Sequence, residues 1–154
     1  MTIRANPYTS ETMPLVQPLV DCAKAVAGMG LETSLLYLVE IRASQINGCA
    51  VCLHMHVTDA LKAGENPIRL HMVGAWRESS LFNERERAAL GWTESLTRLA
   101  ETGAPDADYA ALRAQFSDKE QVMLTLMIGM INSFNKLNVG FRVPAAQTGE
   151  RRAA

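Results

Sequence analysis

The stretch LETSLLYLVEIRASQINGCAVCLHMHVTDALKAGE, residues 31 to 65, is the part of the sequence that decides the fold. Its first half carries leucine, valine and isoleucine at helical spacing, and the Asn47-Gly48 pair that follows is a typical helix stop. A second helix is predicted to begin at or just before Cys49 and to run through the rest of the stretch. The break between the two helices therefore brings the close cysteine pair, Cys49 and Cys52, to a helix start.

The rest of the chain also reads as helices joined by short breaks. No segment shows sustained alternation of apolar and polar residues between turn signals, which would indicate strands. We therefore predict one all-α domain over residues 1–154, since this length suits a single core. Helices are expected within residues 10–28, 31–47, 49–65, 66–80, 82–103, 106–116 and 117–143.

Two helix starts carry capping signals. Asn83 and Ser117 are each followed three residues later by a glutamate, Glu86 and Glu120, as in a capping box. In the first predicted helix, Pro18 should introduce a kink or move the true helix start later along the chain.

Composition excludes several classes of protein. The formal net charge is −1, and Arg151 and Arg152 form a basic pair in a small-residue tail, so no nucleic-acid partner is expected. The N-terminus has no apolar core of a secretory signal. The strongly apolar stretch 122–131 is too short to span a bilayer, so we expect no membrane association and a soluble, cytoplasmic protein.

The cysteine pair has the spacing of reactive chemistry. On a helix, Cys49 and Cys52 lie one turn apart on one face, and His56 follows four residues later. Free backbone N–H groups at a helix start stabilise a thiolate, the reactive form of cysteine. A histidine one turn away can take the thiol proton. This pattern favours a dithiol that closes to a disulfide after one sulfur is oxidised.

Two other interpretations of the pair remain open. Zinc could bind Cys49, Cys52 and either His54 or His56, but a closed structural site needs a fourth ligand, and the remaining cysteine and histidine show no paired spacing. Alternatively, both cysteines are simply small buried residues of the core.

The other conspicuous side chains are assigned to structure. His54 should point away from the site, His71 should lie on a helix surface or at an interface, and Cys22 should pack in the core. The methionine-rich run 123–130 and the two tryptophans are expected in the core or at a subunit contact. The tryptophans are Trp76 and Trp92.

A longer motif adds a family resemblance. Its features are Arg42, the run 44–49 (SQINGC), Cys52, His56 and the Ala-Gly-Glu turn at 63–65. This motif resembles the core of the alkylhydroperoxidase D-like (AhpD-like) branch of the carboxymuconolactone decarboxylase family. The downstream stretches WRESSLFNERERAALGWTESLT and NSFNKLNVGFRVP are also similar to small members of that family. The resemblance covers about residues 30–144.

The resemblance implies a fold, an assembly and an activity. It implies an AhpD-like helical domain of about six to seven helices that assembles through its helices into a homo-oligomer, commonly a trimer or hexamer. It implies a thiol-dependent peroxidase that reduces hydroperoxides and is recharged by an external thiol reductant, either a protein or a small thiol. No cofactor or metal is expected beyond the redox-active Cys49–Cys52 pair.

The resemblance also implies the role of each site residue. Cys52 would be the peroxidatic thiol that passes through a sulfenic acid, Cys49 the resolving thiol and proton donor, and His56 part of the proton relay. The helix-start argument instead favours Cys49 as the more acidic thiol. The prediction follows the resemblance.

One position departs from the family pattern. A glutamate is expected twelve residues before the first cysteine, where this chain has Tyr37. Glu40 stands one helical turn later and is assigned to the catalytic set, because residues three apart share a helix face. The alternatives are that Glu40 pairs with Arg42, Arg77 or Arg113, or is exposed. Proton transfer would then use Tyr37, the histidine or water.

Two further functions compete with the peroxidase. One is a decarboxylase acting on a lactone of aromatic catabolism, although such members of the family do not depend on a C-x-x-C pair. The other is a non-catalytic helical oligomer that uses the dithiol as a redox sensor or zinc clamp.

Overall fold

The computed structural model describes residues 2–145, and within this range the chain is helical with no strand. The predicted all-α fold is therefore confirmed. The tail that contains Arg151 and Arg152 lies outside the described residues. The elements are α1 (Met13–Ala27), α2 (Thr33–Asn47), α3 (Ala50–Lys62), α4 (Pro67–Met72), a 3-10 turn η1 (Val73–Ala75), α5 (Glu84–Thr97), α6 (Leu99–Thr102), α7 (Asp106–Gln115) and α8 (Asp118–Gly140).

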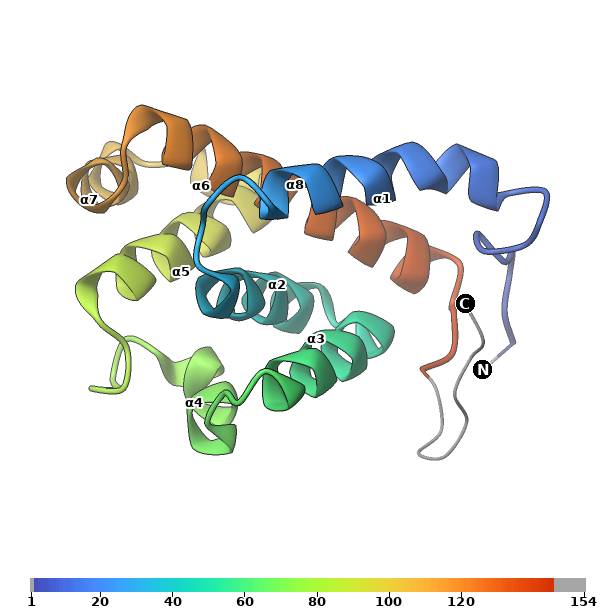
Figure 1. The fold of residues 1–154 in the computed structure, drawn as a ribbon, viewed down its shortest axis with the longest axis horizontal. Coiled ribbons are helices and arrows are strands. Elements are labelled where there is room, and N and C mark those ends of the chain that lie inside the picture. The colour runs from blue at the N-terminus through green and yellow to red at the C-terminus, as the bar shows by residue number, and fades with distance from the viewer. Residues whose placement is uncertain (1, 146–154) are drawn as a thin grey trace.

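Helix α2 lies at the centre of the molecule. It packs against α3, α5 and α8, while α1 lies along α8 on the outside of the bundle (Figure 1). Because α2 has neighbours on several sides, its apolar residues are not confined to one stripe. Its large buried apolar side chains are Leu35, Leu36, Leu38, Val39 and Ile41.

Apolar side chains form two large clusters on either side of α2 and a small one at its end. The first large cluster joins α1, α2, α5, α7 and α8, and the second joins α2 to α3, α4 and α5. The small cluster contains Ala43, Cys49, Cys52 and Ile131. The cysteine pair therefore sits where α2, α3 and α8 meet.

The predicted capping signals form as expected. At both Asn83 and Ser117 the side chain accepts from the backbone N–H three residues later, and the glutamate at that position accepts from the cap's own N–H. These reciprocal bonds satisfy donors that a helix start leaves free. They fix the starts of α5 and α8.

The helix expected over 82–103 is divided, which makes eight α-helices within residues 2–145 rather than six or seven. The backbone leaves helical geometry at Arg98, with φ −109° and ψ 36°. The Thr102 hydroxyl donates to the carbonyl of Ser95 at 2.7 Å. A continuous helix would use that carbonyl as an acceptor for its own N–H group four residues on, so this contact favours the break.

Two of the expectations for α1, a start delayed by Pro18 and a packed Cys22, are wrong. The helix begins at Met13 and continues through Pro18, so the proline does not delay its start. Pro18 is exposed, and water can satisfy the carbonyl that the proline leaves without a donor. Cys22 is exposed rather than packed, because α1 turns Val16 and Val26 inward.

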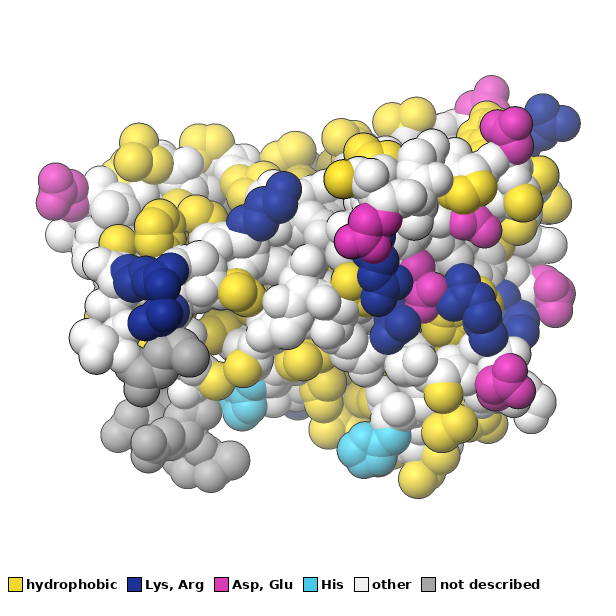
Figure 2. Space-filling model, turned by 180° about the vertical axis from the view of Figure 1, so that it is seen from behind, with side chains coloured by type: hydrophobic (Ala, Val, Ile, Leu, Met, Phe, Trp, Pro, Cys, Tyr) yellow, Lys and Arg dark blue, Asp and Glu magenta, His cyan; other side chains and the backbone are white. Residues whose placement is uncertain are grey.

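The remaining structural assignments are met within the described chain. His54 and His71 are exposed, and both tryptophans are buried. In the methionine-rich run, Met123, Met127 and Met130 lie on the buried face of α8 and pack in the core. On the outer surface seen from behind in Figure 2, basic side chains at the right lie among acidic ones, with apolar side chains exposed between them.

Candidate active site

The site begins at the turn between α2 and α3. Gly48 caps α2 in the left-handed conformation, at φ 66° and ψ 32°, which glycine adopts without strain. The N–H of Cys49 then donates to the carbonyl of Ser44 at 3.0 Å, which closes the turn. This geometry makes Cys49 the N-cap of α3 and puts Cys52 at its third residue. Their Cα atoms are 5.4 Å apart, and the two sulfurs are joined in a disulfide.

Both sulfurs accept a hydrogen bond from an N–H group. The backbone N–H of Cys52 donates to Cys49 Sγ at 3.3 Å, and the amide Nδ2 of Asn138 donates to Cys52 Sγ at 3.3 Å. Each cysteine is only 1% exposed. Donors aimed at a sulfur in a buried site favour its anionic form, so both positions suit a thiolate once the disulfide is reduced.

Glu40 and His56 face each other across α2 and α3. Glu40 Oε2 lies 2.9 Å from His56 Nδ1, and both side chains are largely buried. A carboxylate acceptor requires a proton on Nδ1, so the neutral ring keeps its lone pair on Nε2. That Nε2 is buried and has no hydrogen-bond partner among residues 2–145. The arrangement can accept a proton at Nε2 while the carboxylate stabilises the resulting imidazolium.

Two of the three arginines that the sequence left open as partners for Glu40 are engaged elsewhere, and Glu40 itself pairs with His56. Arg42 and Arg77 both contact Glu94, and Arg42 does so at 2.7 Å. Tyr37, at the position where a glutamate was expected, is half-buried and packs against the apolar cluster of α2 to α5. The structure therefore brings Glu40, rather than Tyr37, into contact with a predicted site residue.

The cluster around Glu94 stabilises the interior. Burial raises the pKa of Glu94, but hydrogen bonds from Arg77, Trp76 and Arg42 outweigh it and hold the pKa below its ordinary value. Trp76 Nε1 donates to Glu94 at 2.9 Å, and Arg42 also donates to Gln45 at 3.0 Å. The cluster ties α2 to α5, which fixes the helix that carries Glu40.

Three asparagines of α8 bond the end of α2 or the disulfide, and the sequence prediction did not include them. Asn135 donates to Ser44 Oγ at 3.1 Å and accepts from Asn47 at 2.9 Å, while Asn47 also donates to Asn132 at 2.8 Å. Asn132, Asn135 and Asn138 recur every third residue along an otherwise mostly apolar helix. That spacing was the available signal, because buried asparagines need partners on one face.

Tyr8 is a further residue that the prediction missed. Its hydroxyl donates to Asn138 Oδ1 at 3.0 Å from a position 130 residues away in the chain. Burial raises the pKa of Tyr8, and its hydrogen bond with Asn138 lowers the pKa in part. No local pattern in the first ten residues points to this contact.

The described residues give no ligand set for a metal. Within residues 2–145, no three or more His, Cys, Asp or Glu side chains are grouped so that they could hold an ion. In the same range, no helix combines the length and apolarity that crossing a bilayer requires.

Comparison with known families matches this site to a class of proteins. The model of the carboxymuconolactone decarboxylase family matches residues 15–95, more than half of the chain, including the whole of the C-x-x-C-x-x-x-H segment. The protein belongs to the carboxymuconolactone decarboxylase family.

Relatives extend the match over most of the chain. The uncharacterized protein YdfG of Bacillus subtilis is 34% identical over 128 residues, which cover 83% of this chain and 87% of that protein. A crystal structure of a protein of unknown function from Agrobacterium tumefaciens, described as a candidate antioxidant defence protein AhpD, is 40% identical. Its TM-score is 0.90, with 95% of this chain and 99% of that chain covered.

A more distant structure shares the fold. An uncharacterized peroxidase-related protein from Silicibacter sp. TM1040 is 20% identical, with a TM-score of 0.73 over 87% of this chain and 70% of that one. The AhpD-like fold that the sequence predicted is therefore confirmed.

Proposed function

We propose that the protein is a thiol-dependent peroxidase that reduces hydroperoxides with the Cys49–Cys52 pair. The observation that carries the proposal is the dithiol at the start of α3, with an N–H donor on each sulfur and the Glu40–His56 pair on the neighbouring turn. The likeness to the Agrobacterium protein, described as a candidate AhpD, supports the same activity.

The reaction has two steps on the protein. The thiolate of Cys52 attacks the outer oxygen of the hydroperoxide; the O–O bond breaks, an alcohol leaves with a proton, and Cys52 becomes a sulfenic acid. The Cys49 thiol then attacks the Cys52 sulfur, forming the disulfide and releasing water. An external dithiol reduces the disulfide and is itself oxidised, which restores both thiols.

His56, assisted by Glu40, would accept and return the proton that moves during this cycle. With Nδ1 bonded to the carboxylate, Nε2 can accept the thiol proton and return it to the leaving alkoxide. Glu40 orients the ring and stabilises its charged form. A compartment that keeps thiols reduced, such as the cytoplasm, suits this cycle.

We also propose that the chain works as a homo-oligomer, either a trimer or a hexamer. Large apolar side chains are exposed on the outer faces of three helices, and a second copy would bury them. They include Leu15 on α1, Met55 on α3, and Val122 and Leu126 on α8.

The test of the activity is consumption of an organic hydroperoxide in the presence of excess dithiol reductant. We expect the wild type and the matched Cys22→Ser control to turn over, Cys52→Ser to be inactive, and Cys49→Ser to lose turnover because its sulfenic acid is not resolved. Undiminished consumption in both Cys49→Ser and Cys52→Ser would overturn the proposal.

The family's name points to a second candidate, decarboxylation of a lactone. That reaction does not need the disulfide chemistry. Lactone decarboxylation retained by the Cys49→Ser/Cys52→Ser double variant would favour it over the peroxidase.

A further inference from the structure

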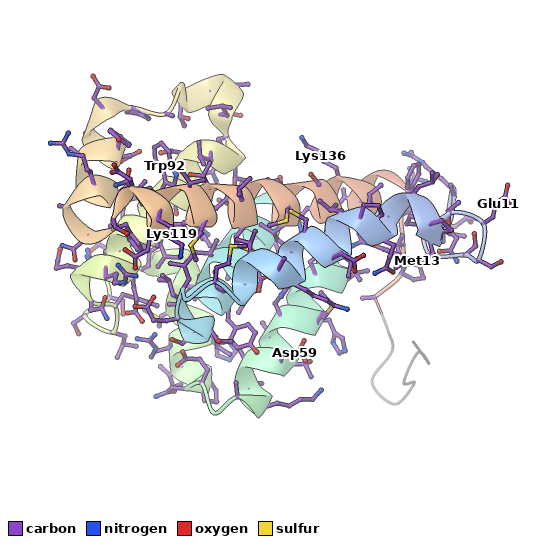
Figure 3. The ribbon with its side chains drawn as sticks, turned by 45° about the horizontal axis from the view of Figure 1, so that its top comes forward. Glu11, Met13, Asp59, Trp92, Lys119 and Lys136 are labelled. Atoms are coloured by element: carbon purple, nitrogen blue, oxygen red, sulfur yellow. A yellow bond between two sulfur atoms is a disulfide. The ribbon has the colours of Figure 1, made fainter. Side chains whose placement is uncertain are left out.

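The segment before α1 reaches the site from outside the helical bundle. It runs beside the C-terminal end of α8, where Glu11 and Met13 mark the entry into α1 (Figures 1 and 3). The N–H of Arg4 donates to the carbonyl of Phe141 at 2.9 Å, and the guanidinium of Arg4 donates to that of Gly140 at 3.3 Å. These two bonds hold the segment against α8 four residues before Tyr8.

The segment delivers one hydroxyl to the amide that touches the disulfide. Tyr8 donates to Asn138 Oδ1 at 3.0 Å, and Asn138 Nδ2 donates to Cys52 Sγ at 3.3 Å. Asn138 is 5% exposed and Cys52 is 1% exposed, so water does not compete for these groups. The three residues form one chain of hydrogen bonds from the N-terminal segment to the sulfur.

We propose that Asn138 is a catalytic residue that stabilises the Cys52 thiolate, and that Tyr8 is a positioning residue that keeps the amide in the orientation this requires. An asparagine amide presents a donor and an acceptor, and rotating it by half a turn exchanges them. The rotated amide would aim its carbonyl oxygen at the sulfur and repel a thiolate. A hydroxyl that donates to Oδ1 selects the orientation in which Nδ2 faces the sulfur.

The inference rests on the proposed function in one respect, because it takes Cys52 as the attacking thiol. Its readout does not involve peroxide. The ultraviolet absorbance of the thiolate is followed between about pH 5 and pH 9 in a Cys22→Ser/Cys49→Ser background, where Cys52 is the remaining cysteine. A failure of the peroxidase proposal therefore leaves this measurement intact.

We expect Asn138→Leu to move the titration midpoint up by about one pH unit, a tenfold loss of thiolate relative to thiol, since a hydrogen bond to a charged group is lost. Asn138→Asp, which keeps the shape and brings a negative charge, should move it at least as far. Tyr8→Phe should move it in the same direction by about half a unit. Tyr109→Phe, at the exposed tyrosine of α7, should leave it unchanged.

A double-mutant cycle separates positioning from mere packing. If Tyr8 acts through the amide, Tyr8→Phe has no further effect once Asn138 is leucine. Circular dichroism confirms folding, and Asn138→Ala, which offers the Tyr8 hydroxyl no side-chain acceptor, replaces Asn138→Leu in the cycle if the leucine variant does not fold. Unmoved midpoints in both Asn138 variants overturn the role of the amide. An unmoved midpoint in Tyr8→Phe, or a shift that persists in the double variant, overturns the role of Tyr8.

Discussion

Glu40 of α2 and His56 of α3 form a buried pair, with Oε2 of the one 2.9 Å from Nδ1 of the other. The pair joins two helices whose connecting turn carries Cys49, so the carboxylate, imidazole and sulfurs belong to one rigid unit. A glutamate one turn later than the position expected from the family resemblance thus contacts His56, the histidine that we propose for the proton relay.

Removing the charge of Glu40 should slow the proposed reduction of hydroperoxides. In Glu40→Gln the amide can keep a contact with His56, but it does not stabilise an imidazolium, so we expect turnover to fall about 10- to 100-fold. Steady-state hydroperoxide consumption measures the change. Tyr37→Phe is the matched variant on the same helix and should stay within about twofold, because the Tyr37 ring packs in an apolar cluster. A larger loss of turnover in Tyr37→Phe than in Glu40→Gln would assign the proton relay to Tyr37 instead of Glu40.

The attacking sulfur should be that of Cys52. Its Sγ receives the amide of Asn138 and lies in the first turn of α3, where free N–H groups favour negative charge. With dimedone present to trap sulfenic acid, hydroperoxide should label Cys52 in the Cys49→Ser variant. Peptide mass spectrometry should find no label on Cys49 in Cys52→Ser. Label on Cys49 in Cys52→Ser, with none on Cys52 in Cys49→Ser, would show that Cys49 attacks. Its place at the helix start favours that alternative.

The asparagine network should contribute strongly to stability. Asn135 is 1% exposed and bonds both Ser44 and Asn47, so Asn135→Ala leaves buried groups without partners. We expect the free energy of unfolding to fall by about 2–3 kcal/mol. Urea titration followed by circular dichroism measures it. The exposed Lys136, which points away from the bundle in Figure 3, provides the control; Lys136→Ala should change stability by less than about 0.5 kcal/mol. Equal losses in the two variants would contradict the role of the network.

The capping box of α8 should make stability depend on pH. Hydrogen bonds from the backbone and side chain of Ser117, with help from Arg85, lower the pKa of Glu120 from 4.5 to about 2. A carboxyl with a depressed pKa stabilises the fold above its unfolded pKa, and this contribution is lost as pH falls toward 2.

Glu120→Gln should therefore lower the free energy of unfolding at pH 7 by about 1 kcal/mol, typical of a lost cap. The difference in free energy of unfolding between Glu120→Gln and the wild type should shrink as the pH falls from 4.5 to 2. Chemical unfolding at several pH values measures this, with the exposed Glu11→Gln as control. A difference that stays constant down to pH 2 would show that Glu120 acts without its charge.

Local signals predicted most of the helices, because caps and stops depend on neighbouring residues. Gly48, Asn83 and Ser117 mark helix ends in the structure as they do in the sequence. The break at Arg98 escaped prediction because the contact that favours it, from the Thr102 hydroxyl to the Ser95 carbonyl, leaves no recognisable pattern in the sequence. The later helix start expected at Pro18 does not occur, because an exposed outer helix tolerates a carbonyl without a donor.

In the candidate site, too, local spacing grouped some of the residues, and tertiary packing brings in the others. Cys49, Cys52 and His56 share one helix, so their spacing was enough to group them. Glu40 needed a family pattern, and its partner was decided by how α2 packs on α3. Asn138 and Tyr8 lie 130 residues apart in the sequence, and only the tertiary fold brings Asn138 to the sulfur and Tyr8 to Asn138.

The central claim is that one hydroperoxide oxidises the Cys49–Cys52 pair in a single turnover. The direct measurement is a count of free thiols in the fully reduced protein before and after one equivalent of hydroperoxide, with the new bond located by peptide mass spectrometry. The chain has three cysteines, and we predict that two thiols disappear, Cys22 stays free, and a Cys49–Cys52 disulfide appears. Three thiols remaining after treatment of the native protein would contradict the claim.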